Sequence, residues 1–161
     1  CRRYEDKIKS VGGIELFLGG VGTDGHIAFN EPGSSLNSRT RIKTLCYETI
    51  NANSRFFDSN IENVPTMALT VGLGTIMDSR EVLIIISGFH KSMALKECLE
   101  GNVNNTYTIT TLQNHNKCII ACDRDSTKDL RIKTYEYFDN LQKKSIGSIF
   151  DLFLYLVHIL I

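Results

Sequence analysis

The sequence predicts an α/β fold built on a parallel sheet, and three observations support this. Short apolar runs alternate with helical stretches from the first residues to about residue 141. The run Glu81–Ile86 is almost continuously apolar, as expected for a strand that is covered on both faces and paired in parallel. Neither an internal repeat nor a linker interrupts the alternation. We therefore expect one continuous layered domain over residues 1–141.

The first elements are a helix and a strand. Residues 1–9 are expected to be helical, because Tyr4 and Ile8 fall on one helical face. The glycine pair that begins at Gly12 supplies the conformational freedom that ends a helix. Residues 14–18 then form a short apolar strand, so the chain begins in the order typical of α/β proteins.

The later elements continue this order. The last predicted helix is expected to begin with a capping box of Ser126 and Asp129, with Asp in place of the usual Glu. Strands are predicted over residues 67–71, 81–86 and 118–122, and helices over residues 75–79, 91–99 and 126–141.

The end of the chain differs in kind, and we treat residues 142–161 as an apolar tail outside the domain. Its longest uninterrupted apolar run has six residues, bounded by Asp151 and His158, whereas a membrane span needs about 18. We therefore expect no membrane association. A membrane helix, a helix that is buried or covered by a partner, and an aberrant end of the gene model remain as alternatives for residues 146–161.

The composition is that of a soluble, core-forming protein, with 42% apolar and 22% charged residues. Eighteen basic residues balance eighteen acidic ones, so no overall field attracts nucleic acid or an anionic membrane. The five cysteines are scattered without zinc-binding spacing, which predicts reduced thiols in a cytoplasmic protein and no metal site. Cys118 and Cys122 are expected to be buried on one strand.

The loop that follows the first strand, residues 19–32, carries the candidate chemistry. Its glycines permit tight turns and a close approach of a ligand to the backbone, and ligands bind at the C-terminal ends of strands in such sheets. Asp24, His26 and Glu31 would place there an imidazole able to transfer a proton, with carboxylates to orient it. This predicts a proton-transfer site. The alternative is a purely structural loop with an Asp-Gly turn.

The string GGVGTDGHIAFNEPGSS, residues 19–35, resembles the signature loop of glucosamine-6-phosphate deaminases almost residue for residue. The resemblance continues through residues 38–45, 53–57 and 64–72 and ends near residue 138. It implies a Rossmann-like three-layer sandwich with a parallel sheet. It also implies a hydrolase of amino-sugar metabolism that converts glucosamine 6-phosphate to fructose 6-phosphate and ammonia. The steps would be ring opening, aldose–ketose isomerisation and deamination, with no metal or organic cofactor.

The resemblance assigns roles to the loop residues. His26 would open the sugar ring by moving a proton from the hydroxyl on carbon 1 to the ring oxygen. Asp24 and Glu31 match the carboxylates that tune this histidine. All three are therefore expected to be catalytic.

The resemblance also implies a binding site for the substrate. Arg55 and Lys91 would hold the phosphate, for which guanidinium and ammonium donors are suited, and Gly20 would lie beside the sugar. Without the resemblance, both cations would be expected to be solvated surface residues.

A second ligand site is implied for the activator N-acetylglucosamine 6-phosphate, as in bacterial hexameric members. A homohexamer is therefore expected. Arg41 and Lys43, two apart on an extended segment, point to one side as a phosphate site requires, although solvated charges on an exposed strand are the alternative. The effector-site residues implied by the resemblance are Ser34, Ser35, Arg41, Lys43 and Tyr137.

The sequence departs from the family at its beginning. The aspartate that moves the proton on carbon 2 belongs to an upstream Asp-Glu-Tyr motif, which this sequence lacks, and the first residue is Cys. We therefore expect the N-terminal part to be missing and this fragment to be inactive. Two other functions remain as alternatives. A 6-phosphogluconolactonase shares the fold, but the match through Arg41, Lys43 and Arg55 argues against it. A non-catalytic sugar-phosphate-binding fragment or subunit is favoured by the absent base.

Overall fold

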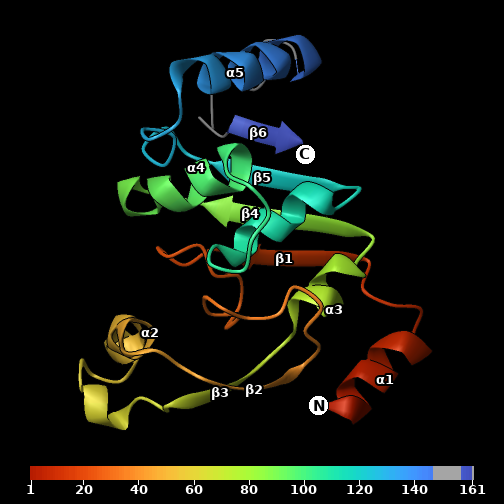
Figure 1. Cartoon of the computed structure of the whole chain (residues 1–161), viewed down its shortest axis with the longest axis vertical. Coiled ribbons are helices and arrows are strands. Elements are labelled where there is room, and N and C mark those ends of the chain that lie inside the picture. Colours follow the sequence, from red (N-terminus) through yellow and green to blue (C-terminus); the bar gives the residue numbers. More distant parts are fainter. Residues whose placement is uncertain (147–156, 161) are drawn as a thin grey trace.

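The computed structural model describes residues 1–146 and 157–160 as a main sheet with helices packed against it (Figure 1). The strand order is β1-β4-β5-β6, in which the first three strands are parallel and β6 is antiparallel to β5. The predicted α/β class with a parallel sheet is thus confirmed. The strands are β1 (Leu16–Gly20), β4 (Glu81–Ile86), β5 (Cys118–Cys122) and β6 (Val157–Leu160).

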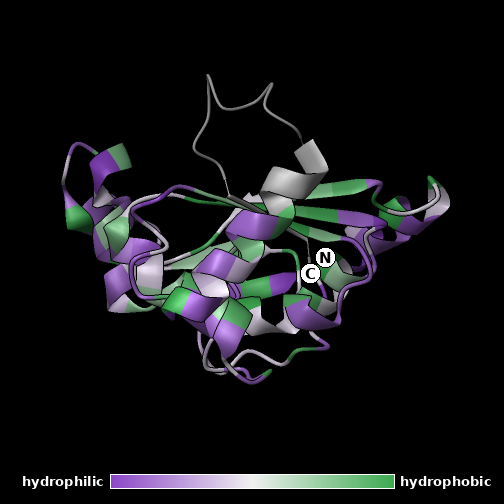
Figure 2. Ribbon diagram, turned by 90° about the horizontal axis from the view of Figure 1, so that it is seen from above, coloured by the Kyte–Doolittle hydropathy of each residue, from purple (hydrophilic) through white to green (hydrophobic). Residues whose placement is uncertain are grey.

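One face of the sheet forms the core. Helices α3 (Leu73–Met77) and α4 (Ser92–Glu100) and the 3-10 helix η4 (Thr108–Asn114) contribute buried apolar side chains to the same cluster as the strands. Figure 2 shows that hydrophobic residues are frequent along the strands, while hydrophilic residues are frequent on helices and loops. The strand residues in the cluster are Val82, Ile84, Ile86, Cys118, Ile120 and Cys122.

The opposite face of the sheet is more open. On β1, Leu18 is 58% exposed, and on β4, Ile85 is 48% exposed while its neighbours Ile84 and Ile86 are fully buried. The expectation that β4 is covered on both faces is therefore not met within the described residues. The strand follows the alternation of a half-buried sheet.

A separate antiparallel ribbon joins β2 (Arg41–Thr44) and β3 (Met67–Thr70) and lies below the main sheet in Figure 1. The strand that the sequence predicts over residues 67–71 is β3. It pairs with β2 and not with a strand of the main sheet. Helix α2 (Tyr47–Asn53) and the 3-10 helices η1 (Ser54–Phe56) and η2 (Ile61–Asn63) connect the two ribbon strands.

The first helix, α1 (Arg2–Ser10), ends as expected, since Gly12 and Gly13 adopt φ values of +93° and +95°. Its buried residue, however, is Glu5, whereas Tyr4 is exposed. The shared face of Tyr4 and Ile8, which predicted the helix, does not supply its buried residue. The helix instead docks through a carboxylate.

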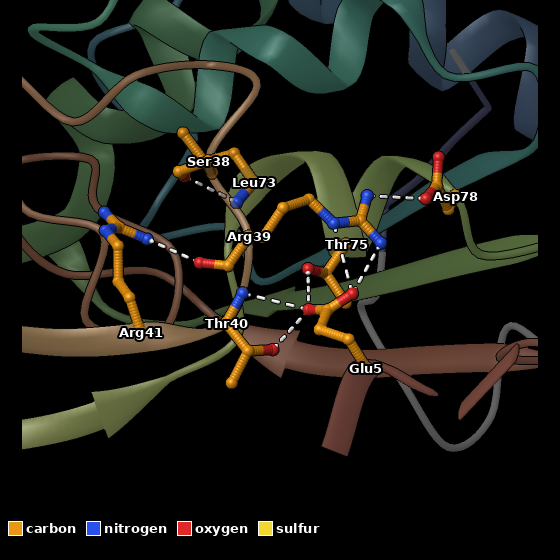
Figure 3. A network of polar contacts seen from close by, with 8 residues as sticks. All are labelled: Glu5, Ser38, Arg39, Thr40, Arg41, Leu73, Thr75 and Asp78. Carbon is orange, nitrogen blue, oxygen red and sulfur yellow. Dashed lines mark hydrogen bonds and ion pairs between the residues drawn. The ribbon is translucent and has the colours of Figure 1, made fainter. Parts of the chain in front are cut away.

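The Glu5 carboxylate is the centre of a hydrogen-bond network (Figure 3). Its Oε1 accepts from the Thr40 amide at 2.9 Å, from the Thr75 hydroxyl at 2.6 Å and from the Thr40 hydroxyl. Its Oε2 accepts from Arg39, which also pairs with Asp78 at 2.6 Å. Burial alone would raise the pKa of Glu5, but the hydrogen bonds outweigh it and lower the pKa from 4.5 to about 2. The network joins α1 to α3 and to the segment before β2.

The last helix, α5 (Ile132–Ile146), begins later than predicted, and its expected capping box does not form. The Ser126 amide donates to the carboxylate of Asp123 at 2.8 Å, and the Ser126 hydroxyl donates to backbone carbonyls. Asp129 accepts from the hydroxyl of Ser92 on α4. Both residues of the predicted box are thus used in tertiary contacts.

The apolar tail lies partly outside the described residues. Residues 157–160 form strand β6, so the helical alternatives are wrong for this stretch. Residues 147–156 and 161 lie outside the described part of the chain. Over residues 1–146 and 157–160, no helix is long and apolar enough to cross a membrane.

The strand cysteines are buried, as predicted. Burial raises the pKa of Cys118 and, with a smaller contribution from the charge of Asp123, that of Cys122, in each case to about 12. These thiols are therefore protonated and act as small apolar residues.

Candidate active site

The loop after β1 folds back so that His26 lies against glycine backbone. The Gly22 amide donates to the His26 carbonyl at 2.8 Å, and Gly25 adopts φ +80°. A Cβ atom at Gly22 would lie 2.4 Å from the imidazole of His26. Glycine is therefore required at position 22 for the ring to occupy its place.

His26 is held by Asp24. The Nδ1 atom of His26 lies 2.6 Å from Oδ1 of Asp24, which also accepts from the His26 amide at 3.3 Å. Burial acts to raise the pKa of Asp24, but the contact with His26 outweighs it and lowers the pKa from 3.8. Asp24 is thus an ionised carboxylate that orients the ring and leaves Nε2 to exchange a proton.

Glu31 is buried and lines the same cavity as this pair, and only one of its oxygens is hydrogen-bonded within the described residues. Its Oε2 accepts from the Cys46 amide at 3.1 Å, while its Oε1 has no hydrogen-bond partner among the described residues. Burial, together with Glu31, raises the pKa of the Cys46 thiol. A buried polar group without a partner is costly and is expected where function requires it.

Two cations face the same region. Arg55 lies on η1, and Lys91 ends the 3-10 helix η3 (Phe89–Lys91) after β4. Burial and, to a smaller extent, the charge of Arg55 lower the pKa of Lys91 from 10.5. Within the described part of the chain, neither residue forms an ion pair. Two unpaired cations held close together suit an anionic ligand.

All these side chains line one cavity of about 890 Å³ at the C-terminal ends of β1 and β4. The tertiary structure therefore brings together every residue predicted to act in catalysis or in substrate binding. These are Gly20, Asp24, His26, Glu31, Arg55 and Lys91.

The cavity also contains residues that the sequence did not single out. Cys46 and Thr49 lie beside Glu31, and Asn53 and His90 lie on the walls that carry Arg55 and Lys91. The position of His90, directly before Lys91, was a signal that could have identified it. The residues of α2 gave no such signal. They reach the loop after β1 only because the connection between β2 and β3 folds back toward it, and the local sequence does not predict this.

The five residues of the predicted effector site do not line this cavity, and one chain does not gather them in one place. Arg41 and Lys43 lie on the same face of β2, and Arg41 donates to Asn30 Oδ1 at 2.8 Å. Ser34 is buried, and Ser35 is exposed. Tyr137 is exposed on α5, at the opposite end of the molecule from the ribbon (Figure 1).

Among the described residues, no group of three or more His, Cys, Asp or Glu side chains is arranged to hold a metal ion.

The chain was compared with known proteins. No protein-family model matches it. It is 56% identical over 149 residues to a glucosamine-6-phosphate deaminase of Actinobacillus pleuropneumoniae serotype 5b (strain L20), covering 92% of this chain and 56% of that protein. It is 57% identical over 146 residues to the glucosamine-6-phosphate deaminase of Vibrio cholerae serotype O1 (strain M66-2), covering 91% of this chain and 55% of that protein. The chain thus spans a little over half the length of these relatives.

Solved structures agree. A monomeric glucosamine-6-phosphate deaminase of the NagB superfamily superposes with a TM-score of 0.76 at 42% identity, over 78% of this chain and 52% of that one. The 6-phosphogluconolactonase of Trypanosoma brucei superposes with a TM-score of 0.59 at 17% identity, over 81% of this chain and 52% of that one, which shows the fold alone.

Fold and cavity together define the class of protein as an α/β member of the NagB superfamily. Within that class, the sequence identity is decisive, since it is 42–57% with the three deaminases and 17% with the lactonase. The chain belongs to the glucosamine-6-phosphate deaminase family.

Proposed function

We propose that the protein carrying this chain converts glucosamine 6-phosphate to fructose 6-phosphate and ammonia. The observation that carries the proposal is the composition of the cavity. It combines an imidazole–carboxylate pair, His26 and Asp24, with two unpaired cations, Arg55 and Lys91. The first pair suits proton transfer on a sugar, and the second suits its phosphate.

In this proposal His26 acts as acid and base in ring opening. Its Nε2 accepts the proton of the hydroxyl on carbon 1 and returns a proton to the ring oxygen, so that the ring bond breaks and the aldehyde forms. Asp24, held ionised, stabilises the imidazolium between the two transfers. Glu31 supports this pair with its unpartnered oxygen. Isomerisation and hydrolytic loss of ammonia follow without a metal or an organic cofactor, and one water supplies the oxygen that replaces the departing nitrogen.

Arg55 and Lys91 hold the phosphate at the far end of the substrate. Binding energy gained there orients the reacting end at His26. Gly20 lies at the end of β1, where the backbone lines the cavity and a sugar can approach it closely.

The experiment that tests the proposal is an assay of ammonia release from glucosamine 6-phosphate by the gene product that contains this chain. Changing His26→Gln is expected to abolish turnover of the cyclic substrate and to spare turnover of an analogue locked in the open form. Equal loss on both substrates would remove His26 from ring opening. Binding without turnover by the unchanged protein would favour a non-catalytic sugar-phosphate-binding subunit.

We also propose that N-acetylglucosamine 6-phosphate activates the enzyme at the effector site defined above, within a cytoplasmic homohexamer. The adjacent cations of β2 support a phosphate ligand. Because Tyr137 lies apart from Arg41 and Lys43 in one chain, a site that uses all of them requires more than one copy. The free cysteines suit a reducing compartment. Sedimentation velocity with and without the activator tests the assembly, and a monomer under both conditions would contradict it.

A further inference from the structure

The turn that carries Lys91 into the cavity is tightly folded. Gly88 adopts φ +90°, and its carbonyl accepts from the Lys91 amide at 3.1 Å. A Cβ atom at Gly88 would lie 2.8 Å from the imidazole of His90, so the turn leaves no space there for a larger residue. The backbone of this turn therefore determines where Lys91 lies.

Asp123 holds the beginning of this turn. It directly follows β5, and because β4 and β5 are parallel and end at the same edge of the sheet, it lies beside the residues that follow β4. Its carboxylate accepts from the Ser87 hydroxyl at 2.6 Å and from the Gly88 amide at 2.9 Å. It also accepts from the Ser126 amide at 2.8 Å.

The charge state of Asp123 suits this role. Burial acts to raise its pKa, but the hydrogen bonds from Ser87, Ser126 and Gly88 outweigh it and lower the pKa from 3.8 to about 2. The carboxylate is ionised at neutral pH, and charge-assisted hydrogen bonds are stronger than neutral ones.

Asp129 holds the other end of the turn. Its carboxylate accepts from the hydroxyl of Ser92, the residue that follows Lys91. Two acids from the segment after β5 thus fix the turn on both sides of Lys91. Neither acid lines the cavity.

Lys91 depends on this support. It is partly buried beside Arg55, whose positive charge repels it, and in residues 1–146 no carboxylate pairs with it. Because no ion pair within the described residues fixes the Lys91 ammonium group, its position depends on how firmly the backbone of the turn is held.

We propose that Asp123 is a positioning residue for the phosphate site, which fixes the turn of residues 87–91 so that Lys91 meets the anion. The proposal rests on the proposed function in one respect, namely that Lys91 binds the substrate phosphate. Asp123 acts through Lys91 and does not touch the substrate itself.

A double-mutant cycle tests this. Binding of inorganic phosphate and of glucosamine 6-phosphate is measured by calorimetry on the gene product that contains this chain, unchanged and with Asp123→Asn, with Lys91→Met, and with both changes. Asp123→Asn is expected to weaken the binding of both ligands roughly tenfold when Lys91 is present and to have little effect when it is absent, since residues of one network are coupled. Unphosphorylated glucosamine is expected to bind equally to the chain with and without Asp123→Asn.

The matched control is Asp125→Asn. Asp125 lies in the same segment, but its ion pair is with the exposed Lys128, so phosphate binding is expected to be unchanged. Ser87→Ala provides a milder change that removes one of the contacts of Asp123. It is expected to weaken phosphate binding in the same direction, and it keeps the test decisive if Asp123→Asn lowers the melting temperature.

The outcomes separate the two proposals. Phosphate binding that Asp123→Asn and Ser87→Ala leave unchanged overturns the positioning role and leaves the proposed function standing. An equal loss from Asp123→Asn with and without Lys91 also overturns it, because the residue then acts on the fold as a whole. If phosphate does not bind to the unchanged gene product, or binds equally well after Lys91→Met, the phosphate site itself is wrong, and the inference fails with it.

Discussion

Glu5 and Glu31 are both buried glutamates of the described residues, Glu5 with 8% and Glu31 with 5% of its surface exposed. Both oxygens of Glu5 accept hydrogen bonds, from Arg39, Thr40 and Thr75 (Figure 3). Glu31 accepts one, from the Cys46 amide, and its other oxygen has no partner among the described residues. Both residues are buried carboxylic acids, and they differ in how many of their oxygens accept hydrogen bonds.

This difference separates structural from functional use of a buried carboxylate. The complete network of Glu5 lowers the pKa of this residue and joins three segments, so it contributes to stability. Glu31, which lines the same cavity as His26, keeps acceptor capacity at a cost to the folded state, as active sites do. Changing each carboxylate should therefore affect a different property, which the following variants test.

The largest expected effect is on stability. Glu5→Gln removes the charge and one acceptor, and the unfolding free energy should fall by about 1.5–3 kcal/mol for each charged hydrogen bond lost. Chemical denaturation measures it. The matched control is Glu15→Gln, which disrupts the exposed pair with Arg80 and should cost less than about 1 kcal/mol. Equal effects of the two changes would contradict a structural role for the Glu5 network.

Glu31→Gln should lower catalytic activity and leave stability unchanged, which is the opposite of the effect expected for Glu5→Gln. If Glu31 supports His26 as proposed, kcat of the gene product that contains this chain should fall about 100-fold for glucosamine 6-phosphate. The unfolding free energy should not fall, because an amide is easier to bury than a carboxylate with an unpaired oxygen. Steady-state kinetics and denaturation of the same preparations measure both. Exposed Glu62→Gln serves as control, and a loss of stability without loss of kcat would assign Glu31 to the fold.

Acid should destabilise the chain in part through the Glu5 carboxylate, while the contribution of Asp123, whose pKa is also lowered to about 2, is common to the unchanged chain and the Glu5 variant. Because the folded-state pKa of Glu5 is lowered from 4.5 to about 2, its contribution to stability is present above pH 4.5 and is lost as the pH falls to about 2. Chemical denaturation at several pH values between these limits gives the unfolding free energy as a function of pH. This free energy should fall more steeply with decreasing pH for the unchanged chain than for Glu5→Gln. Parallel curves would show that Glu5 is not the group responsible.

The smallest effect is expected from a single donor. Thr75 is buried, and its hydroxyl donates to Glu5 Oε1 at 2.6 Å. Thr75→Val keeps the shape and removes one charged hydrogen bond, at a cost of about 1.5–3 kcal/mol. In the Glu5→Gln background the cost should shrink, because the charged partner is gone. An undiminished cost there would mean that Thr75 stabilises the chain through packing alone.

The local patterns in the sequence were sufficient for the three parallel strands of the main sheet and for the contents of the active-site loop. Apolar runs located strands β1, β4 and β5, because burial in a sheet requires such runs. The loop string identified Asp24, His26 and Glu31, and the structure places all three in one cavity. A contact within a few residues, such as that between Asp24 and His26, follows from spacing in the sequence.

Only the tertiary structure decided the contacts between distant segments. Glu5 and Thr75 are 70 residues apart, and nothing in either local sequence predicts that a helix docks through its carboxylate. Ser126 has the pattern of a helix cap, yet its hydroxyl bonds to the carbonyl of Ile86, 40 residues away, and α5 begins later. The physical reason is that a hydroxyl or a carboxylate bonds equally well to any partner within reach, and packing of the sheet and helices determines which partner that is.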